Sequence, residues 1–245
     1  MTLKNLVEQL QYISNKVVEA ESCGNTFLIY ELLPHEDLDF VKDEVIYLLR
    51  KRKRDSGLVL QGVEPNIWQM FVVEKDGSVS AFCGNGAKSI ALYMFQYHKL
   101  DEFYLMKDQM EHCLVRYQSD CNFPSVEIKN VELINGIYYV FGEPHIIYAT
   151  SLMRIKELAN TYDNVNFSCI EQMDRTRWKI ITWERGVNGV TQSCGSACVA
   201  AMCFLVSNGE KATEITFECP GGDNIVSYRN GLYVLTGQAS CDPRI

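Results

Sequence analysis

Two short stretches of this 245-residue sequence repeat one local pattern around a cysteine, at Cys83 and at Cys194. Each cysteine is followed by glycine, then by Asn or Ser, and then by small and apolar residues at helical spacing, so each is predicted to begin a helix. The N–H groups in the first turn of a helix lack internal partners and carry partial positive charge. We therefore expect the pKa of both thiols to be lowered and their reactivity to be raised.

The glycines that follow the cysteines, Gly84 and Gly195, would let a ligand approach the helix N–H groups closely, because they have no side chain. A carboxylate or a phosphate fits such a site. Cys, Gly and Ala also pack well at the start of a helix, and this explanation suffices for a single copy. Two copies, 111 positions apart, instead favour a site in which two helix ends and two thiols face one anionic ligand.

The composition is that of an ordinary globular protein, with 47% hydrophobic and 22% charged residues, and its length allows one large domain or two smaller ones. The net charge of -8 argues against nucleic acid or an anionic membrane as a partner. One basic run, residues 50–54, follows an amphipathic stretch, and we interpret it as the solvated end of a helix. No stretch reaches the roughly 18 apolar residues of a membrane span.

The ten cysteines do not indicate a disulfide framework, because a chain of this length needs no such crosslinks and shows no signal peptide. Residues 1–16 instead carry apolar side chains at helical spacing, which predicts a small surface helix. We expect a cytoplasmic, reducing environment. The four histidines and the lack of a CxxC pair argue against a zinc site. Cys198 and Cys203 are interpreted as packing residues.

Both halves of the sequence give strands first, then a cysteine-led helix, then further strands. In the first half a predicted hairpin, residues 68–82, delivers Cys83 at the end of a strand. In the second half Pro144 is expected to halt strand pairing and to leave His145 at the edge of a loop. This similarity is a weak internal repeat, and we place the boundary near Asn130, giving domains of residues 1–130 and 131–245.

Nearly the whole chain resembles the diaminopimelate epimerases and related amino-acid racemases that work without pyridoxal phosphate. Cys83-Gly84-Asn85-Gly86-Ala87 resembles the first catalytic motif of that family, with Asp76-Gly77-Ser78 at the usual distance before it. Glu184-Arg185-Gly186 followed by Thr191-Gln192-Ser193-Cys194-Gly195-Ser196 resembles the second. Three shorter matches occur in the family's order: Gly24-Asn25-Thr26-Phe27, Gly142-Glu143-Pro144-His145 and Asn164-Val165-Asn166-Phe167.

The resemblance implies an α/β fold of two pseudo-symmetric domains, each a curved, mostly antiparallel sheet wrapped around a central helix. The active site would lie in the cleft between them, and residues 237–245 would return to the N-terminal domain. It also implies a cofactor-independent reaction on a small amino-acid substrate, with neither a metal nor an organic cofactor. Inverting a Cα centre in this way needs a base on one face and an acid on the other, which two thiols across a cleft can supply.

The family's residues match this sequence position by position. The resemblance assigns Cys83 and Cys194 as the acid/base pair, and Glu184 and His145 as groups that hold the substrate amine or assist the thiols. The positions that match substrate-binding residues are Asn25, Asn164 and Arg185. The positions that match the cradle for the substrate carboxylate are Gly84, Asn85, Gly195 and Ser196.

Two departures from the family pattern bear on the substrate and not on the reaction type. Glu74 and Glu143 stand where most diaminopimelate epimerases have asparagine, and both would contact the substrate. An ionised Glu74 favours a distal cation on the substrate and repels a distal carboxylate unless a cation such as Arg185 compensates. We favour the conversion of LL- to meso-diaminopimelate, because Arg185 suits a distal carboxylate.

Two other interpretations stay open. One is a racemase of another amino acid, such as histidine or a basic amino acid. The other is a thiol-based redox sensor or binding protein that keeps the fold without turnover, since exposed thiols at helix ends oxidise easily. The sequence also leaves open whether the chain forms a homodimer.

Overall fold

The computed structural model describes residues 12–13, 16–80, 82–106, 112–119, 123–159, 164–185, 187 and 189–242. Its helices are α2 (Leu38–Arg52), α3 (Gly84–His98), α4 (Ile155–Ala159) and α5 (Gly195–Ser207), with a 3-10 helix η1 (Leu152–Arg154) before α4. Its strands are β1 (Val18–Ser22), β2 (Asn25–Glu31), β3 (Ser56–Glu64), β4 (Ile67–Glu74), β5 (Val79–Ser80), β6 (Glu102–Met106), β7 (His112–Gln118), β8 (Phe123–Ile128), β9 (Val131–Ile134), β10 (Ile137–Val140), β11 (Glu143–Ala149), β12 (Asn166–Gln172), β13 (Arg177–Glu184), β14 (Gly189–Val190), β15 (Glu214–Cys219), β16 (Gly222–Arg229), β17 (Leu232–Gly237) and β18 (Ser240–Cys241).

The strands form two series that follow one plan. In the first half, β1–β2 and β3–β4 pair antiparallel, β2–β3 pair parallel, and β4 pairs antiparallel with β5 and parallel with β6. In the second half, β10 to β15 pair in the same order and directions. The parallel steps cross over through α2 and α3 in the first half and through α4 and α5 in the second. The predicted internal repeat is therefore confirmed in the strand pairing.

The repeat extends to the residues that end equivalent strands. Glu74 is the last residue of β4 and Glu184 is the last residue of β13, and both strands have 8 residues. Each strand is followed by a short antiparallel partner and then by a helix that begins next to a cysteine. Glu74 and Glu184 are therefore equivalent positions of the repeat, as are Cys83 and Cys194.

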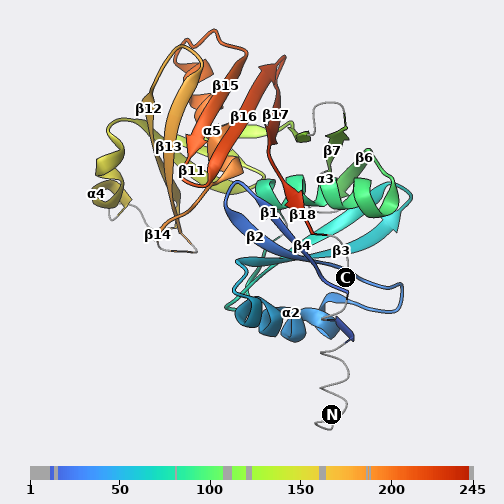
Figure 1. The fold of residues 1–245 in the computed structure, drawn as a ribbon. Helices are drawn as coiled ribbons and strands as arrows, with labels where there is room; N and C mark the ends of the chain where they lie inside the picture. The colour runs from blue at the N-terminus through green and yellow to red at the C-terminus, as the bar shows by residue number, and fades with distance from the viewer. Residues whose placement is uncertain are drawn as a thin grey trace.

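The two halves share strand contacts and one hydrophobic core. β8 pairs with β17, and β18, near the end of the chain, pairs with β1. Figure 1 shows β18 (red) lying against the blue N-terminal strands. The main core cluster contains residues of both α3 and α5, among them Ile90, Met94, Val199 and Met202, all with exposed fractions of 0%. Each central helix is packed inside the strands of its half, and the two helices also touch each other.

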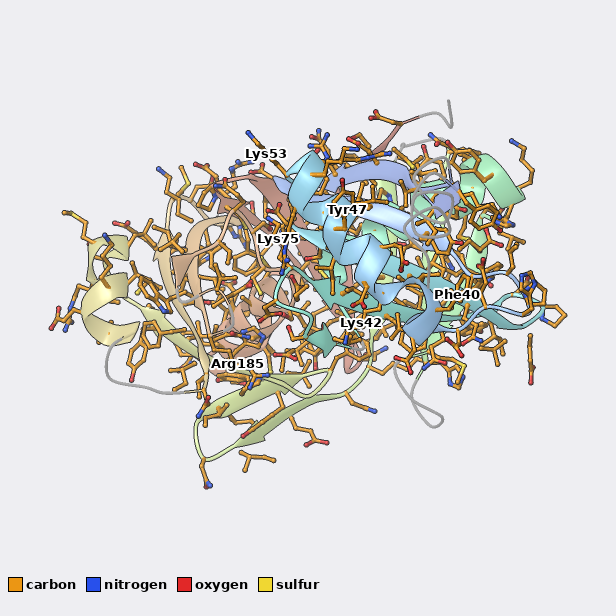
Figure 2. The ribbon with its side chains drawn as sticks, turned by 90° about the horizontal axis from the view of Figure 1, so that it is seen from below. Phe40, Lys42, Tyr47, Lys53, Lys75 and Arg185 are labelled. Atoms are coloured by element: carbon orange, nitrogen blue, oxygen red, sulfur yellow. The ribbon has the colours of Figure 1, made fainter. Side chains whose placement is uncertain are left out.

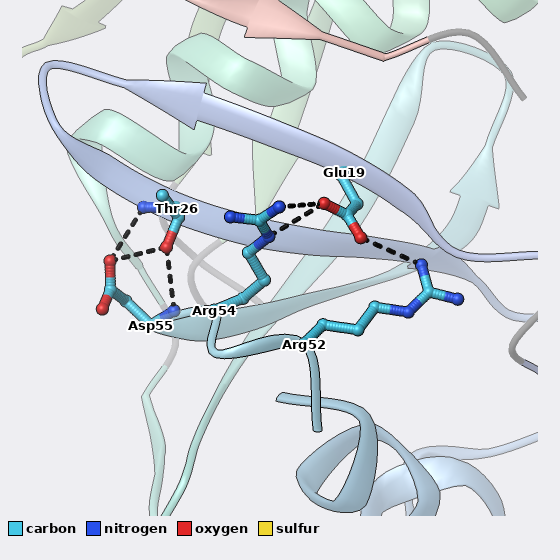
Figure 3. Close-up of polar contacts among 5 residues, drawn as sticks. All are labelled: Glu19, Thr26, Arg52, Arg54 and Asp55. Atoms are coloured by element: carbon cyan, nitrogen blue, oxygen red, sulfur yellow. Dashed lines mark hydrogen bonds and ion pairs between the residues drawn. The ribbon is translucent and has the colours of Figure 1, made fainter. Parts of the chain in front are cut away.

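The basic run at the end of α2 forms contacts within the first half. Glu19 of β1 forms ion pairs with Arg52 and with Arg54, and Asp55 accepts hydrogen bonds from the backbone and hydroxyl of Thr26 (Figure 3). α2 ends at Arg52, as expected for cations at a helix C-terminus. These two arginines therefore tie α2 to β1 and are not a free cationic patch.

The mixed α/β class and most strands are as predicted, but one local prediction is wrong. His145 does not lie at a loop edge: Pro144 pairs with Tyr139, and β11 continues through both residues. Proline needs no N–H here because it stands at the second position of its strand, beside a turn. Most of the predicted N-terminal helix, residues 1–16, lies outside the described residues, and the domain boundary near residue 130 stays a prediction. None of the described helices combines the length and the hydrophobicity of a membrane span.

Candidate active site

The two motif cysteines stand at equivalent helix starts. Cys83 is the N-cap of α3, in extended backbone geometry, and its Sγ accepts a hydrogen bond from the N–H of Gly86 at 3.4 Å. Cys194 is the N-cap of α5, and its Sγ lies 3.4 Å from the hydroxyl of Ser196. Both cysteine residues are half-buried. The prediction that both cysteines begin helices is confirmed.

The starts of α3 and α5 lie directly against each other. A Cβ atom added to Gly84 would come within 3.6 Å of the Gly195 Cα, and one added to Gly195 within 3.5 Å of the Gly84 Cα. Both added atoms would also collide with the Leu235 side chain, at 2.9 and 2.7 Å. At both positions a side chain would displace Leu235, whereas glycine leaves the helix ends in direct contact. Their first-turn N–H groups can then act on one anionic ligand together.

The pKa values of the thiols run opposite to the expectation from helix position. Burial raises the pKa of Cys83 to about 12, and the carboxylates of Glu184 and Glu74 add to the rise. Burial and the Glu184 carboxylate raise the pKa of Cys194 well above its ordinary value. The helix N–H groups oppose these effects but are outweighed. The prediction of lowered pKa values is therefore wrong, because the sequence does not reveal desolvation or the nearby carboxylates.

Each thiol has a partly desolvated carboxyl group in its vicinity. Burial raises the pKa of Glu184, which accepts hydrogen bonds from Cys194 and, at 3.3 Å, from the hydroxyl of Thr191. Burial also raises the pKa of Glu74, whose two carboxylate oxygens each lie 3.0 Å from the hydroxyl of Ser56. The repeat thus places one glutamate at the same strand end in each half.

Two asparagines predicted to bind substrate also fix the segment before Cys194. The side-chain amides of Asn25 and Asn85 donate to the backbone carbonyl of Ser193, at 3.0 and 3.3 Å. Asn85 is buried, and its side-chain oxygen has no hydrogen-bond partner among the described residues. That oxygen points toward the start of α5, 3.4 Å from where a Cβ of Gly195 would stand. It is available to a donor on a ligand.

His145 is fully buried, with an exposed fraction of 0%, and neither ring nitrogen has a hydrogen-bond partner among the described residues. Burial and the charge of Arg185 lower the pKa of His145 to about 3, so its imidazole is neutral. An unpaired imidazole in a protein interior is unusual, because leaving a buried polar group unpaired costs free energy. A ligand group could supply the missing partner.

The remaining predicted residues form a group around Arg185. Its guanidinium pairs with Glu143 at 2.9 Å and donates to the backbone carbonyl of Asn164 at 3.4 Å, while its backbone N–H donates to the side chain of Asn166. Asn164 itself is exposed, with a φ of 62°. Lys75, the equivalent of Arg185 in the first half, faces Asp55 at 3.8 Å. Figure 2 shows both cations, Lys75 next to α2 and Arg185 among the strands of the second half.

The charge balance of this region is acidic. Its two cations already face a carboxylate each, whereas within the described residues Glu74 and Glu184 form no ion pair with a cation. Among the described residues, no cluster of three His, Cys, Asp or Glu side chains could hold a metal ion. Sequence reasoning missed Ser56, Thr191 and Ser193, which hold the carboxylates and the cysteine loop. Only three-dimensional pairing reveals these serine and threonine contacts.

No protein-family model matches the chain. In sequence, the chain is 26% identical over 230 residues to the diaminopimelate epimerase of Thermotoga maritima, covering 87% of this chain and 94% of that protein. In fold, it is similar to a phenazine biosynthesis protein of the PhzF family from Enterococcus faecalis, with a TM-score of 0.70, 10% identity, and coverage of 93% and 96%. A probable proline racemase from Agrobacterium radiobacter, solved with bound carbonate, gives a TM-score of 0.63, 10% identity, and coverage of 93% and 92%.

These similarities confirm the predicted fold class, an α/β fold with curled sheets in two halves. They also indicate that the chain is an isomerase of the epimerase and racemase type. The relatives carry different substrate names, so the similarities support an amino-acid epimerase without assigning its substrate.

Proposed function

We propose that the chain inverts the Cα centre of an amino acid by a two-thiol, cofactor-independent mechanism, with LL-diaminopimelate as the first substrate to test. The observation that carries this proposal is the contact between the starts of α3 and α5, each preceded by a cysteine at an equivalent position of the repeat. A ligand at this contact has a thiol from each half of the molecule beside it. This is what inversion without a cofactor requires.

In the proposed mechanism one thiol, as thiolate, removes the Cα proton and the other delivers a proton to the opposite face. Both thiols are protonated at rest, because their pKa values are raised. Glu184 accepts the proton of Cys194, and burial raises the pKa of both groups. The raised pKa of Glu184 favours this proton transfer, whereas the raised pKa of Cys194 opposes it. In the reverse direction, the same transfer starts at Cys83, whose neighbours are Glu184 and Glu74.

The substrate carboxylate would lie on the N–H groups of Gly84, Asn85, Gly195 and Ser196. These helix-start groups stabilise the negative charge that spreads onto the carboxylate as the Cα proton leaves. The substrate amine would donate to the unpaired oxygen of Asn85 or to the neutral ring of His145. Both buried groups lack a partner among the described residues, so binding would also remove a cost to folding.

The acidic balance supports a substrate with a distal cation, and Glu74 is the group we assign to hold it. The sequence relatives that are diaminopimelate epimerases support diaminopimelate in particular. Its distal carboxylate would bind Arg185 and Asn164. For this to happen, the guanidinium must bridge the substrate and Glu143, or exchange one carboxylate for the other.

A second candidate, a racemase of a basic amino acid or histidine, is favoured by the ion pair of Arg185 with Glu143. A guanidinium that already has an internal carboxylate at 2.9 Å has less need of one from the substrate. In this alternative Glu74 and Glu143 both face a purely cationic side chain. The mechanism at the two thiols is unchanged.

The deciding experiment measures kcat/KM for LL-diaminopimelate, L-lysine, L-arginine and L-histidine on the wild type and on Glu74→Asn. We expect diaminopimelate to be the fastest substrate and Glu74→Asn to weaken KM for every substrate with a distal ammonium. A wild type that turns over lysine, arginine or histidine faster overturns diaminopimelate and favours the second candidate. No turnover of any of the four would favour the redox-sensor or binding interpretation.

A further inference from the structure

The central helix of the first half, α3, carries a lysine that is completely buried in the protein. Lys88 has an exposed fraction of 0% on α3, in a run of small and apolar residues that begins after Cys83. Its Nζ donates to the side-chain oxygen of Asn224 and lies 3.2 Å from the Sγ of Cys23. Lysine is almost never fully buried, since the amine loses its hydration. A residue of this kind needs an explanation beyond packing.

The contacts of Lys88 lead to the segment that carries Cys194. Asn224 also has an exposed fraction of 0%. Its side-chain oxygen accepts a hydrogen bond from Lys88, and its side-chain N–H donates to the hydroxyl of Ser193 at 2.7 Å. The carbonyl of Ser193 receives the amides of Asn25 and Asn85. Ser193, immediately before Cys194, is therefore held at its hydroxyl by Asn224 and at its backbone carbonyl by Asn25 and Asn85.

The internal repeat shows that the fold does not require this polar pair. Lys88 is the fifth residue after Cys83, and the fifth residue after Cys194 is Val199, fully buried in the core. Asn224 also has an apolar equivalent. In the second half, Trp178 of β13 pairs with Phe217, and Phe217 pairs with Asn224. In the first half, Trp68 of β4 pairs with Leu105, and Leu105 pairs with Cys113. Cys113 is therefore the equivalent of Asn224. Cys113 is buried with an exposed fraction of 2%.

The polar pair thus bridges the two halves once, and the repeat-related pair, Val199 and Cys113, is apolar. A buried polar pair rarely adds stability over apolar residues of similar size. Such a pair does fix geometry, because unpaired alternatives are costly. The partners come from both halves: Lys88, Asn25 and Asn85 from the first, and Asn224 and Ser193 from the second.

We propose that Lys88 is a positioning residue that, through Asn224 and Ser193, sets the place of the Cys194 thiol relative to Cys83. A residue of α3, the helix that begins next to Cys83, thereby sets the position of the Cys194 thiol. This role rests on the proposed function, since it concerns the alignment of two thiols on opposite faces of one Cα. Lys88 touches neither thiol and acts only through its partners.

The test uses the apolar pattern that the repeat already contains. The double variant Lys88→Met/Asn224→Leu removes both polar groups together. Neither the amine nor the amide is then left buried without the other. The second variant, Ser193→Ala, removes only the hydroxyl that receives Asn224. The matched control is Ser89→Ala, the next residue of α3, whose buried hydroxyl has no hydrogen-bond partner among the described residues. All proteins are compared for thermal midpoint, kcat, KM, and the ratio of iodoacetamide alkylation rates at Cys194 and Cys83, followed by mass spectrometry.

We expect the double variant and Ser193→Ala to fold, to lose about tenfold or more in kcat with little change in KM, and to alter the alkylation ratio at Cys194. Ser89→Ala should match the wild type in all four. An alkylation ratio and kcat equal to those of Ser89→Ala in both folded variants would overturn the positioning role. If the wild type itself turns over no amino acid, the proposed function fails, and the alkylation ratio alone then decides whether Lys88 positions Cys194.

Discussion

At the scale of single residues, burial shifts the pKa of several ionisable groups of the site towards their neutral forms. It is the first cause in each case: it raises the pKa of Cys83, Cys194, Glu74 and Glu184 and lowers that of His145. The two thiols and the imidazole therefore start uncharged, and the site can redistribute protons when a zwitterionic amino acid binds. The same burial has consequences for folding stability, because a shifted pKa makes stability depend on pH.

Replacing Glu74 should stabilise the protein at neutral pH. Because its pKa is raised, the folded state holds this proton more tightly than the unfolded state, so its contribution falls as pH rises through the raised pKa. Glu74→Gln has no charge to bury and keeps an acceptor for Ser56. We expect a gain on the order of 1 kcal/mol in the free energy of unfolding at pH 8, reduced by solvent screening and vanishing near pH 4. Urea titrations at both pH values check this, with the exposed Glu171→Gln as control. Equal stabilities at pH 8 would refute it.

His145 should make the protein less stable in mild acid. Its folded-state pKa is about 3, so its contribution is fully present above the unfolded pKa near 6.5 and is lost as pH falls from there. The difference in unfolding free energy between wild type and His145→Gln should therefore shrink between pH 7 and pH 5, by roughly 1.4 kcal/mol per pH unit below pH 6.5. The exposed His112→Gln serves as the control. A difference that is constant with pH would contradict a buried, neutral His145.

At the scale of helices and strands, the close contact of the two helix starts should tolerate no side chain. Gly195→Ala would place a Cβ 2.7 Å from the fully buried Leu235 side chain, which would have to shift within the packed core. We expect a loss of about 1–3 kcal/mol in unfolding free energy and a clear fall in kcat, despite the better helix propensity of alanine. Gly189→Ala is the matched control, because its nearest neighbour would be 3.9 Å away. Wild-type stability and activity in Gly195→Ala would mean that the core around Leu235 accommodates a side chain at this helix start.

The elements also show how far sequence reasoning reaches. The strand, turn, cysteine and helix order was predictable at both motifs, because turn residues, apolar periodicity and helix starts are local signals. The β11 strand through His145 was not, because its pairing with β10 and β12 overrides the expected effect of Pro144. The contacts of Ser193 could not be predicted from the sequence either, because the amides that donate to its carbonyl lie 108 and 168 positions away in the chain. The direction of the thiol pKa shifts depends on the same long-range burial.

At the scale of the whole molecule, the repeat and the shared core describe two halves that stabilise each other. Residues of both halves belong to one hydrophobic cluster, and β8 pairs with β17 across them. A site built from one thiol of each half depends on this contact. The two thiols can keep a fixed separation only if the halves do not unfold separately.

We therefore expect a single cooperative unfolding transition. Trp68 of β4 reports on the first half and Trp178 of β13 on the second, and both contact the main core cluster. Variants that keep only one of these tryptophans, with the others replaced by phenylalanine, should give superimposable urea curves by fluorescence. Two distinct midpoints would show that each half folds on its own, as the predicted domains of residues 1–130 and 131–245 would allow.

The most direct test of the two-thiol epimerase is solvent deuterium uptake at Cα. LL-diaminopimelate, L-lysine, L-arginine and L-histidine are incubated in D2O with wild type, Cys83→Ala, Cys194→Ala and the control Cys203→Ala, and the Cα–H signal is followed by NMR. The account predicts that wild type and Cys203→Ala incorporate deuterium with inversion of configuration, while neither Cys83→Ala nor Cys194→Ala forms the inverted product. Full inversion in either motif variant, or no uptake by the wild type with any of the four, would contradict it.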